Sequence, residues 1–361
     1  MKSTGWLAVP LLLVTFSPCL GLVWLSEVRK GGVVGRIKLD RVNQRLHGVV
    51  VDHTHNHGAD RRIWSDALCQ RRDLYVYLPP GFDPRQAYPL VIWLHGVGQD
   101  EASFVDRVVE VIDQAIWCGQ LPPLIIAAPD GSINGHACLL TPGSFYINSR
   151  AGRFEDYVMQ DVWNFVFANY PIRPEPEAHV IAGASMGGGA AYNLGIKYRD
   201  RVKVVVGLLP PLNSRWVDCH GRYMANFDPC CWGWRTDFSH RHEVIGRFYC
   251  VVAIRLKQVI DPLYGKHDPD IVEEVSRENP IEMLDAYQLK DGELAMFLGY
   301  AGKDQFNIDA QAESFLFVAR QRGLSITVEY EPDGKHDAKT AGKMAPALFD
   351  WLGPLLRPYS P

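Results

Sequence analysis

The stretch VIAGASMGGGAAYNLG, residues 180–195, joins two hydrophobic patterns at a single serine. The apolar run at 180–182 is typical of a buried strand, whereas small and apolar residues recur at helical spacing after Ser185. Gly183 and Gly187 flank the serine, and glycine lets a helix start close to a sheet. The same Gly-x-Ser-x-Gly pattern also forms the strained turn that exposes a nucleophilic serine above a sheet. The motif alone does not decide between packing and chemistry.

Strands and helices alternate along most of the chain, which predicts an α/β fold with a mostly parallel eight-stranded sheet and helices on both faces. The first two strands form an antiparallel pair, and the continuous apolar runs that follow are typical of strands buried on both faces. We expect strands at 47–52, 73–80, 89–96, 124–131, 180–182, 202–211, 294–300 and 325–332, and helices at 103–117, 155–170, after Ser185, at 307–322 and from 338.

The alternation breaks between about residues 212 and 289, where tryptophan, cysteine, histidine and proline crowd together. Because this segment follows the sixth strand, it is expected to form an inserted cap over the serine. We therefore expect residues 26–44 to be a linker and 45–361 to form one domain that contains the cap. Aromatic residues of the cap line an acyl or sugar pocket or, equally, pack a small subdomain: Trp216, Tyr223, Phe227, Trp232 and Trp234.

Three residues with matching chemistry follow the fifth, seventh and eighth expected strands: Ser185, Asp304 and His336. In such a sheet, functional residues gather beyond the carboxyl ends of the strands. A serine hydroxyl needs a base to become a nucleophile, and a carboxylate can hold the basic histidine in one tautomer. The order Ser–Asp–His is that of an α/β-hydrolase. Asp309 and Asp337 are the rival acids, but the first is expected inside a helix and the second adjoins the histidine in sequence.

The sequence HGVG at 95–98 follows the third strand directly. In this architecture, the loop at that place and the residue after the nucleophile donate backbone N–H groups to the oxyanion. We assign these donors to Val97 and Met186, and we expect His95 to hold the loop.

These motifs together resemble the esterase D and feruloyl-esterase type of α/β-hydrolase. The resemblance rests on VYLPPGFD, LHGVGQDEASF, SFYINS with GRFEDYV, GASMGGGAAYNL, AGKDQFN and DGKHD, and it covers about residues 45–211 and 290–355. It implies a carboxylic-ester hydrolase that needs no metal or other cofactor, with Ser185, Asp304 and His336 as its triad. The same type includes acetyl-xylan esterases, S-formylglutathione hydrolases and mycolyltransferases, so it does not fix the substrate.

The leading hypothesis is a serine esterase that forms an acyl-enzyme and acts on acetyl or feruloyl esters of carbohydrates. We expect substrate contacts from His95, Tyr146, Asn148 and Trp232. A small serine peptidase of the prolyl-oligopeptidase type is the alternative among enzymes. A carbohydrate-binding protein that retains the scaffold is the alternative outside them.

Residues 1–25 form a nearly uncharged apolar segment, which predicts a secretory signal peptide or a membrane anchor and hence an exported protein. The net charge of −4 gives no electrostatic case for nucleic acid, and the oligomeric state stays open. In the cap, a disulfide is favoured over a zinc site, and Cys230 is not expected to bond its neighbour Cys231. The alternating histidines of HTHNH, residues 53–57, are expected in a solvated loop.

Overall fold

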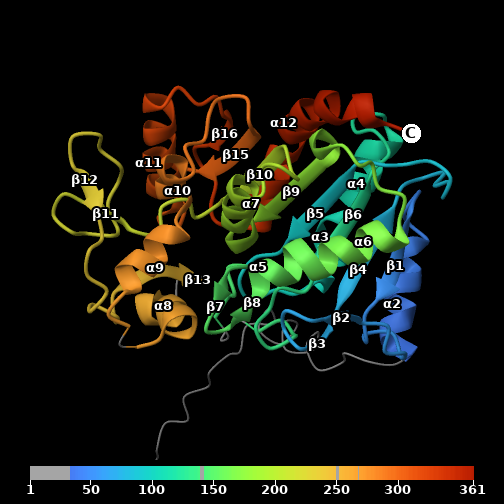
Figure 1. Cartoon of the computed structure of the whole chain (residues 1–361), viewed down its shortest axis with the longest axis horizontal. Helices are drawn as coiled ribbons and strands as arrows, with labels where there is room; N and C mark the ends of the chain where they lie inside the picture. The colour runs from blue at the N-terminus through green and yellow to red at the C-terminus, as the bar shows by residue number, and fades with distance from the viewer. Residues whose placement is uncertain (1–32, 139–141, 249–251, 267) are drawn as a thin grey trace, which may run out of the picture.

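A computed structural model describes residues 33–138, 142–248, 252–266 and 268–361. Eight strands form one sheet in the order β1-β4-β6-β5-β9-β10-β15-β16, with helices around it (Figure 1). β1 and β4 pair in antiparallel fashion, β4 is also antiparallel to β6, and every later pairing is parallel. The predicted mostly parallel sheet is thus confirmed. Its strands are β1 (Val49–His53), β4 (Leu74–Leu78), β5 (Leu90–Leu94), β6 (Ile125–Pro129), β9 (His179–Ala184), β10 (Val204–Leu208), β15 (Ala295–Ala301) and β16 (Thr327–Glu331).

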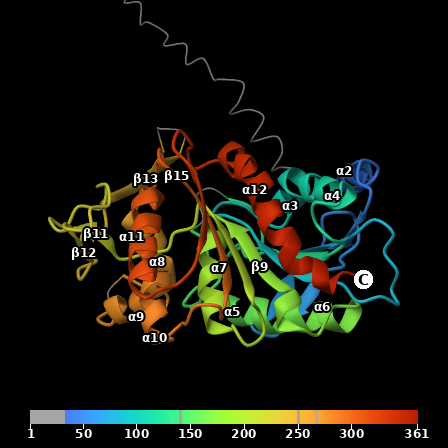
Figure 2. The same ribbon diagram turned by 90° about the horizontal axis from the view of Figure 1, so that it is seen from above.

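Helices cover both faces of the sheet, as the alternating pattern predicts (Figure 2). One face carries α2 (Val33–Asn43), α3 (Ala102–Arg107), α4 (Val109–Trp117) and α12 (Ala338–Leu356). The other carries α5 (Phe154–Asp156), a π-helical stretch (Tyr157–Val162), α6 (Trp163–Asn169), α7 (Met186–Lys197) and α11 (Ile308–Gln321).

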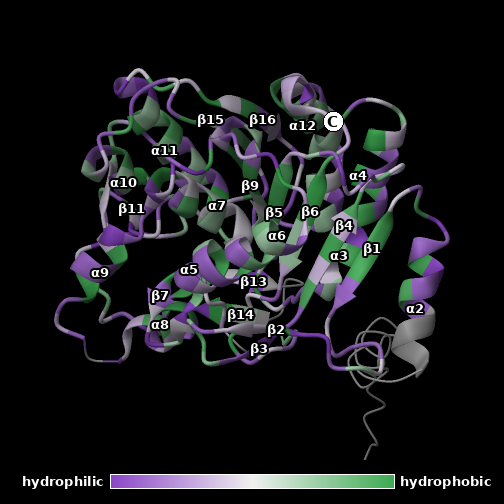
Figure 3. Cartoon of the chain, turned by 45° about the vertical axis from the view of Figure 1, so that its right-hand side comes forward, coloured by the Kyte–Doolittle hydropathy of each residue, from purple (hydrophilic) through white to green (hydrophobic). Residues whose placement is uncertain are grey.

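Burial on both faces explains the continuous apolar runs of the central strands. Every residue of β5 and β6 is buried. Val91 and Trp93 of β5 pack on one face, while Leu90, Ile92 and Leu94 pack on the other. These strands are therefore mostly coloured as hydrophobic in Figure 3.

The segment predicted to be a linker contains a helix. Helix α2 lies within residues 26–44, and its Leu39 and Val42 are 7% and 4% exposed against the sheet. Burial of these two side chains makes this part of the segment an element of the core. Residues 1–25, the predicted signal peptide or anchor, lie outside the described residues. Within the part of the chain that is described, no helix is both long and apolar enough to span a membrane.

The insertion between β10 and β15 has more regular structure than the sequence suggests. It contains two short hairpins, β11 (Trp216–Asp218) with β12 (Trp232–Trp234) and β13 (Val244–Phe248) with β14 (Val252–Arg255). Three helices follow: α8 (Leu256–Tyr264), α9 (Ile271–Arg277) and α10 (Pro280–Ala286). Figure 1 places the β11–β12 hairpin at the outer end of the molecule. Helix α10, in contrast, packs its apolar residues into the core beside α7 and α11.

A disulfide joins Cys219 to Cys231 across the β11–β12 hairpin. Both expectations about the cysteines of the cap are therefore confirmed: a disulfide forms there, and Cys231 does not bond Cys230. The cross-link closes the loop that carries Tyr223.

Candidate active site

The turn between β9 and α7 explains both glycines of the quoted motif. A Cβ at Gly187 would overlap the Leu94 carbonyl, and one at Gly183 would lie 2.5 Å from the Gly187 carbonyl carbon. Ser185 itself adopts φ 54° and ψ −123°, a conformation that non-glycine residues rarely take, and its N–H donates to the Leu208 carbonyl at 2.8 Å. Close packing and a strained serine are therefore two aspects of the same turn.

The structure brings the three predicted triad residues into one chain of hydrogen bonds. The Ser185 Oγ lies 2.7 Å from Nε2 of His336, and Nδ1 of His336 lies 2.7 Å from Oδ2 of Asp304. The Asp304 side chain is fully buried, and that of His336 is 10% exposed. With a proton on Nδ1 donated to the carboxylate, Nε2 is left to accept the serine proton.

Short-range contacts fix the positions of Asp304 and His336. The second carboxylate oxygen of Asp304 accepts a bond from the Phe306 N–H at 2.8 Å, and the His336 N–H donates to the Gln305 side chain at 2.8 Å. The Phe306 ring packs edge-on to the His336 ring, with centroids 4.9 Å apart. The imidazole is therefore held at its ring, at its backbone and at Nδ1.

Residues 304–307, which we call the acid loop, are held by Tyr223 of the insertion. The sequence did not indicate this contact. The Tyr223 hydroxyl donates to the Phe306 carbonyl at 2.8 Å and accepts from the Gln311 amide at 2.9 Å. The Tyr223 carbonyl accepts from Nδ2 of Asn307 at 2.7 Å, and Asn307 has a left-handed backbone with φ 56°. Tyr223 thus supports the acid loop rather than a substrate pocket.

The two rival acids, Asp309 and Asp337, do not take the place of Asp304 beside Nδ1 of His336. Asp337 caps helix α12 and accepts a bond from the Thr340 N–H at 2.8 Å. Asp309 lies in the first turn of α11, where burial and the nearby charge of Asp304 raise the pKa of its carboxyl from 3.8 to about 6. His336 contacts Asp304 instead of either rival.

The loop after β5 lies beside the serine. A Cβ at Gly96 would be 3.4 Å from the Ser185 Cβ, and a Cβ at Gly143 would contact both Val97 and Met186, so these last two side chains are neighbours. The Gly96 N–H donates to the Gln99 side chain at 3.0 Å, which shapes the loop.

His95 supports this loop through hydrogen bonds of both ring nitrogens. Its Nε2 accepts a bond from the Gly131 N–H at 2.9 Å, and its Nδ1 donates to the Gly96 carbonyl at 2.9 Å. Both ring nitrogens are thus engaged with backbone groups, one of them in the neighbouring loop at Gly131. At 3% exposure, His95 is placed to support the loop rather than to contact substrate.

Two of the residues predicted to contact substrate have structural positions instead. Tyr146 is fully buried, and its hydroxyl accepts a bond from the His95 N–H at 3.0 Å, so it lies under the loop and not in a cleft. Trp232 lies in β12 and packs against Trp234, Phe227 and Phe317. Asn148 is exposed on β7 (Asn148–Ser149), where its side chain accepts a bond from the Asp156 N–H.

The histidines of HTHNH are more buried than predicted. His57 is 8% exposed and bonds the Tyr75 hydroxyl at 2.7 Å, while His53 bonds the Tyr170 hydroxyl at 2.6 Å. His55 contacts the Asp73 carboxylate through Nδ1. Each ring thus has a separate partner, which explains why the stretch is folded rather than solvated.

Two groups of described residues bring possible metal ligands together. In the first, Cys219 and Cys231 are joined in the disulfide, so they offer no thiolate. The second consists of the buried carboxylates Asp73, Glu101 and Asp130. Here the Arg72 guanidinium supplies a cation, with Nη2 3.1 Å from Oδ2 of Asp130.

Comparison with solved structures shows an α/β-hydrolase fold. A ferulic acid esterase matches with a TM-score of 0.61 at 17% identity, over 86% of this chain and 99% of that one. An S-formylglutathione hydrolase from Agrobacterium tumefaciens matches with a TM-score of 0.59 at 13% identity, over 86% and 96%. The ferulic acid esterase AmCE1/Fae1A from Anaeromyces mucronatus, in complex with ferulic acid, gives 0.51 at 16% identity, over 84% and 91%.

The chain belongs to the family described as "Putative esterase", whose family model matches residues 65–343. This agrees with the resemblance seen in the sequence motifs. A stretch of 78 residues, 21% of the chain, is 37% identical to endo-1,4-beta-xylanase Y of Acetivibrio thermocellus. That match spans 7% of the curated relative's own length.

Proposed function

We propose that the protein is a serine carboxylesterase that works through an acyl-enzyme. The observation that carries this proposal is the continuous chain of hydrogen bonds from Ser185 through His336 to Asp304, which starts at a strained turn. Membership of an esterase family supports the same reaction class.

In the proposed first half-reaction, Ser185 Oγ attacks the ester carbonyl while Nε2 of His336 takes its proton. Asp304 stabilises the resulting imidazolium and keeps the ring in position. The oxyanion accepts hydrogen bonds from the backbone N–H groups of Val97 and Met186, and the loss of one such donor typically costs about 10²–10³ in rate. When the intermediate collapses, His336 returns the proton to the alcohol oxygen, which leaves.

In the second half-reaction, water attacks the acyl-enzyme. His336 removes the proton of the water, the same N–H groups hold the second oxyanion, and Ser185 regains its proton as the acid departs. Each step uses groups of this chain, and we propose that no metal or cofactor takes part.

We propose acetyl or feruloyl esters of carbohydrates as substrates. The support is the likeness to proteins named as ferulic acid esterases and the local match to a xylanase polypeptide. We also propose that the protein is exported. The Cys219–Cys231 disulfide supports this, because such bonds persist mainly in oxidising compartments.

A panel of esters tests these proposals: p-nitrophenyl acetate, butyrate and octanoate, methyl ferulate, acetylated xylan and S-formylglutathione. Ser185→Ala should abolish turnover of every substrate while the melting temperature stays near that of the wild type. Fastest cleavage of the glutathione thioester would contradict the carbohydrate-ester proposal, and activity retained in Ser185→Ala would contradict the reaction mechanism.

A further inference from the structure

A buried ion pair, Arg72 with Asp130, lies next to the loop after β5. Arg72 ends strand β3 (Gln70–Arg72), and its Nη2 lies 3.1 Å from Oδ2 of Asp130. The Arg72 side chain is 1% exposed, and that of Asp130 is fully buried. Such a pair gains little stability over apolar packing, because both charges have lost their hydration. The groups that the pair holds in place therefore indicate its role.

The Arg72 guanidinium anchors the segment that follows β6. Its Nη2 donates to the Asp130 carbonyl at 2.9 Å and to the Ser132 carbonyl. Its Cζ lies 5.5 Å from the centroid of the Phe154 ring and 5.8 Å from that of the Tyr157 ring. A planar cation packed against aromatic rings keeps one orientation. Residues 130–132 are therefore tied to a fixed point in the core.

The Asp130 carboxylate faces the His95 ring. Its Oδ1 accepts a bond from the Ser132 N–H at 2.9 Å and lies 3.7 Å from Nε2 of His95. Burial raises the pKa of the Asp130 carboxyl, but the charge of Arg72 and the contact with His95 outweigh burial and keep the pKa below 3.8. A carboxylate that is charged at neutral pH thus lies beside the ring that supports the loop after β5.

His95 connects this buried charge to a proposed oxyanion donor. Its Nε2 binds the Gly131 N–H, and its Nδ1 binds the Gly96 carbonyl, each at 2.9 Å. The Gly96 carbonyl and the Val97 N–H belong to one peptide group, in which the C=O and the N–H point in opposite directions. The hydrogen bond from the imidazole to the carbonyl therefore sets the direction of the Val97 N–H.

From this series of contacts we propose that Arg72 and Asp130 are positioning residues for the oxyanion. The ion pair holds His95, and His95 holds the peptide group that presents the Val97 N–H. The inference rests on the proposed esterase function and adds to it two residues that act without touching the substrate.

Arg72→Gln should lower kcat and leave KM nearly unchanged. Without the guanidinium, residues 130–132 lose their anchor, and the peptide group that His95 holds is no longer fixed. Loss of one oxyanion donor typically costs about 10²–10³ in rate, so a misaligned donor should lower kcat by about ten- to hundredfold. KM should stay nearly constant, because the oxyanion forms only after the substrate has bound.

Three measurements on the full-length protein separate this role from a general effect on the fold. The first is kcat and KM for p-nitrophenyl butyrate, per active site titrated with a fluorophosphonate. The second is the Ki of an alkyl trifluoromethyl ketone, which adds to Ser185 and forms an oxyanion, and Ki should rise by the factor by which kcat falls. The third is the downfield proton NMR signal of Nδ1–H of His336. It should not change, because His336 bonds to Ser185, Asp304 and Gln305 rather than to this ion pair.

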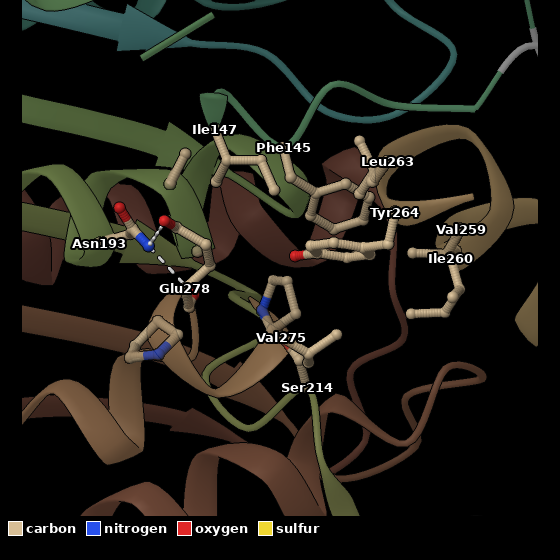
Figure 4. Close-up of a pocket in the computed structure, with 14 residues that line it drawn as sticks. Phe145, Ile147, Asn193, Ser214, Val259, Ile260, Leu263, Tyr264, Val275 and Glu278 are labelled. Carbon is tan, nitrogen blue, oxygen red and sulfur yellow. Dashed lines mark hydrogen bonds between the residues drawn. The ribbon is translucent and has the colours of Figure 1, made fainter. Parts of the chain in front are cut away.

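Lys197→Gln is the matched control. Lys197 of α7 is another largely buried cation, 11% exposed, and it pairs with the carboxylates of Glu155 and Glu278. Figure 4 shows Glu278 bonded to Asn193 of the same helix, beside a cavity. This variant also removes a cation from buried carboxylates, so it should lower the melting temperature. Its kcat per active site and its ketone Ki should remain those of the wild type.

A double variant covers the case in which Arg72→Gln does not fold. Arg72→Met with Asp130→Leu replaces the ion pair by apolar side chains, a change that buried pairs often tolerate. It still releases His95, so kcat should again fall by about ten- to hundredfold and the ketone Ki should rise to match.

A kcat per active site within twofold of the wild type, in Arg72→Gln or in the double variant, would overturn the positioning role. Equal losses of kcat in Arg72→Gln and Lys197→Gln would also overturn it, as would a lower kcat with an unchanged ketone Ki. These results would leave the esterase proposal intact. A wild type that neither hydrolyses esters nor reacts with the fluorophosphonate would overturn both.

Discussion

The contact between the insertion and the acid loop predicts that Tyr223→Phe lowers turnover without altering substrate binding. Tyr223 is 8% exposed, and its hydroxyl makes two hydrogen bonds, to the Phe306 carbonyl and from the Gln311 amide. Its removal deletes both of these bonds, and the loss of a hydrogen bond to a buried polar group typically costs about 1–3 kcal/mol. The Phe306 N–H binds Asp304 and the Phe306 ring contacts His336, so a shifted loop disturbs both.

The expected decrease in kcat is about ten- to hundredfold, with KM nearly unchanged. The lower value corresponds to an activation free energy raised by about 1.4 kcal/mol, because Asp304 and His336 are less well aligned. The upper value stays well below the roughly 10⁴-fold loss that follows when the acid of a triad is replaced by its amide. An unchanged KM is expected because Tyr223 is 8% exposed and its hydroxyl binds only Phe306 and Gln311 among the described residues.

The assay is hydrolysis of p-nitrophenyl butyrate, with active sites counted by titration with a fluorophosphonate. This normalisation separates misfolded protein from folded protein that turns over slowly. Tyr287→Phe in the same insertion is the control and should match the wild type. If Tyr223→Phe lowers the melting temperature but leaves kcat per active site unchanged, Tyr223 only stabilises the fold, and the reasoning about the acid loop is refuted.

Three further predictions follow from the same geometry. Asp304→Asn should lower kcat by about 10³–10⁴ through loss of the correct histidine tautomer, and near-normal p-nitrophenyl butyrate turnover would assign the acid to another carboxylate. Because the folded state raises the pKa of Asp309 from 3.8 to about 6, that residue binds its proton more tightly when folded, so its contribution to stability falls as pH rises from about 4 to 6. Asp309→Asn should therefore melt progressively higher than the wild type over that interval in thermal scans, and a constant difference would contradict the assignment. Replacing Cys219 and Cys231 together with alanine should cost about 2–4 kcal/mol in urea unfolding, whereas Cys230→Ala, on an exposed residue, should cost almost nothing.

The sheet could be predicted because its pattern is local. The run at 90–94 is apolar throughout since β5 is buried on both faces, and Gly183 and Gly187 mark a turn where strand and helix pack closely. The order of Ser185, Asp304 and His336 then placed all three at one edge of the sheet.

Contacts between residues far apart in the sequence could not be predicted from local patterns. Tyr146 lies in the SFYINS motif, but only the folded chain brings its hydroxyl to the His95 N–H. Tyr223 lies far from Phe306 in sequence, so nothing local marks their hydrogen bond. Helix α2 could not be predicted locally, because the glycines at positions 31, 32 and 35 are typical of a connector, whereas the burial of Leu39 depends on the sheet that follows.

The central claim, that Ser185 is a nucleophile activated by His336, is tested most directly by the site and rate of fluorophosphonate labelling. The wild type, Ser185→Ala and His336→Ala are each treated with the probe, and the modified peptide is identified by mass spectrometry. The account predicts one adduct, on Ser185, no adduct in Ser185→Ala, and labelling slowed by several orders of magnitude in His336→Ala, because the residues of a triad act as a unit. An adduct on another residue, or labelling of Ser185 at an undiminished rate without His336, would contradict it.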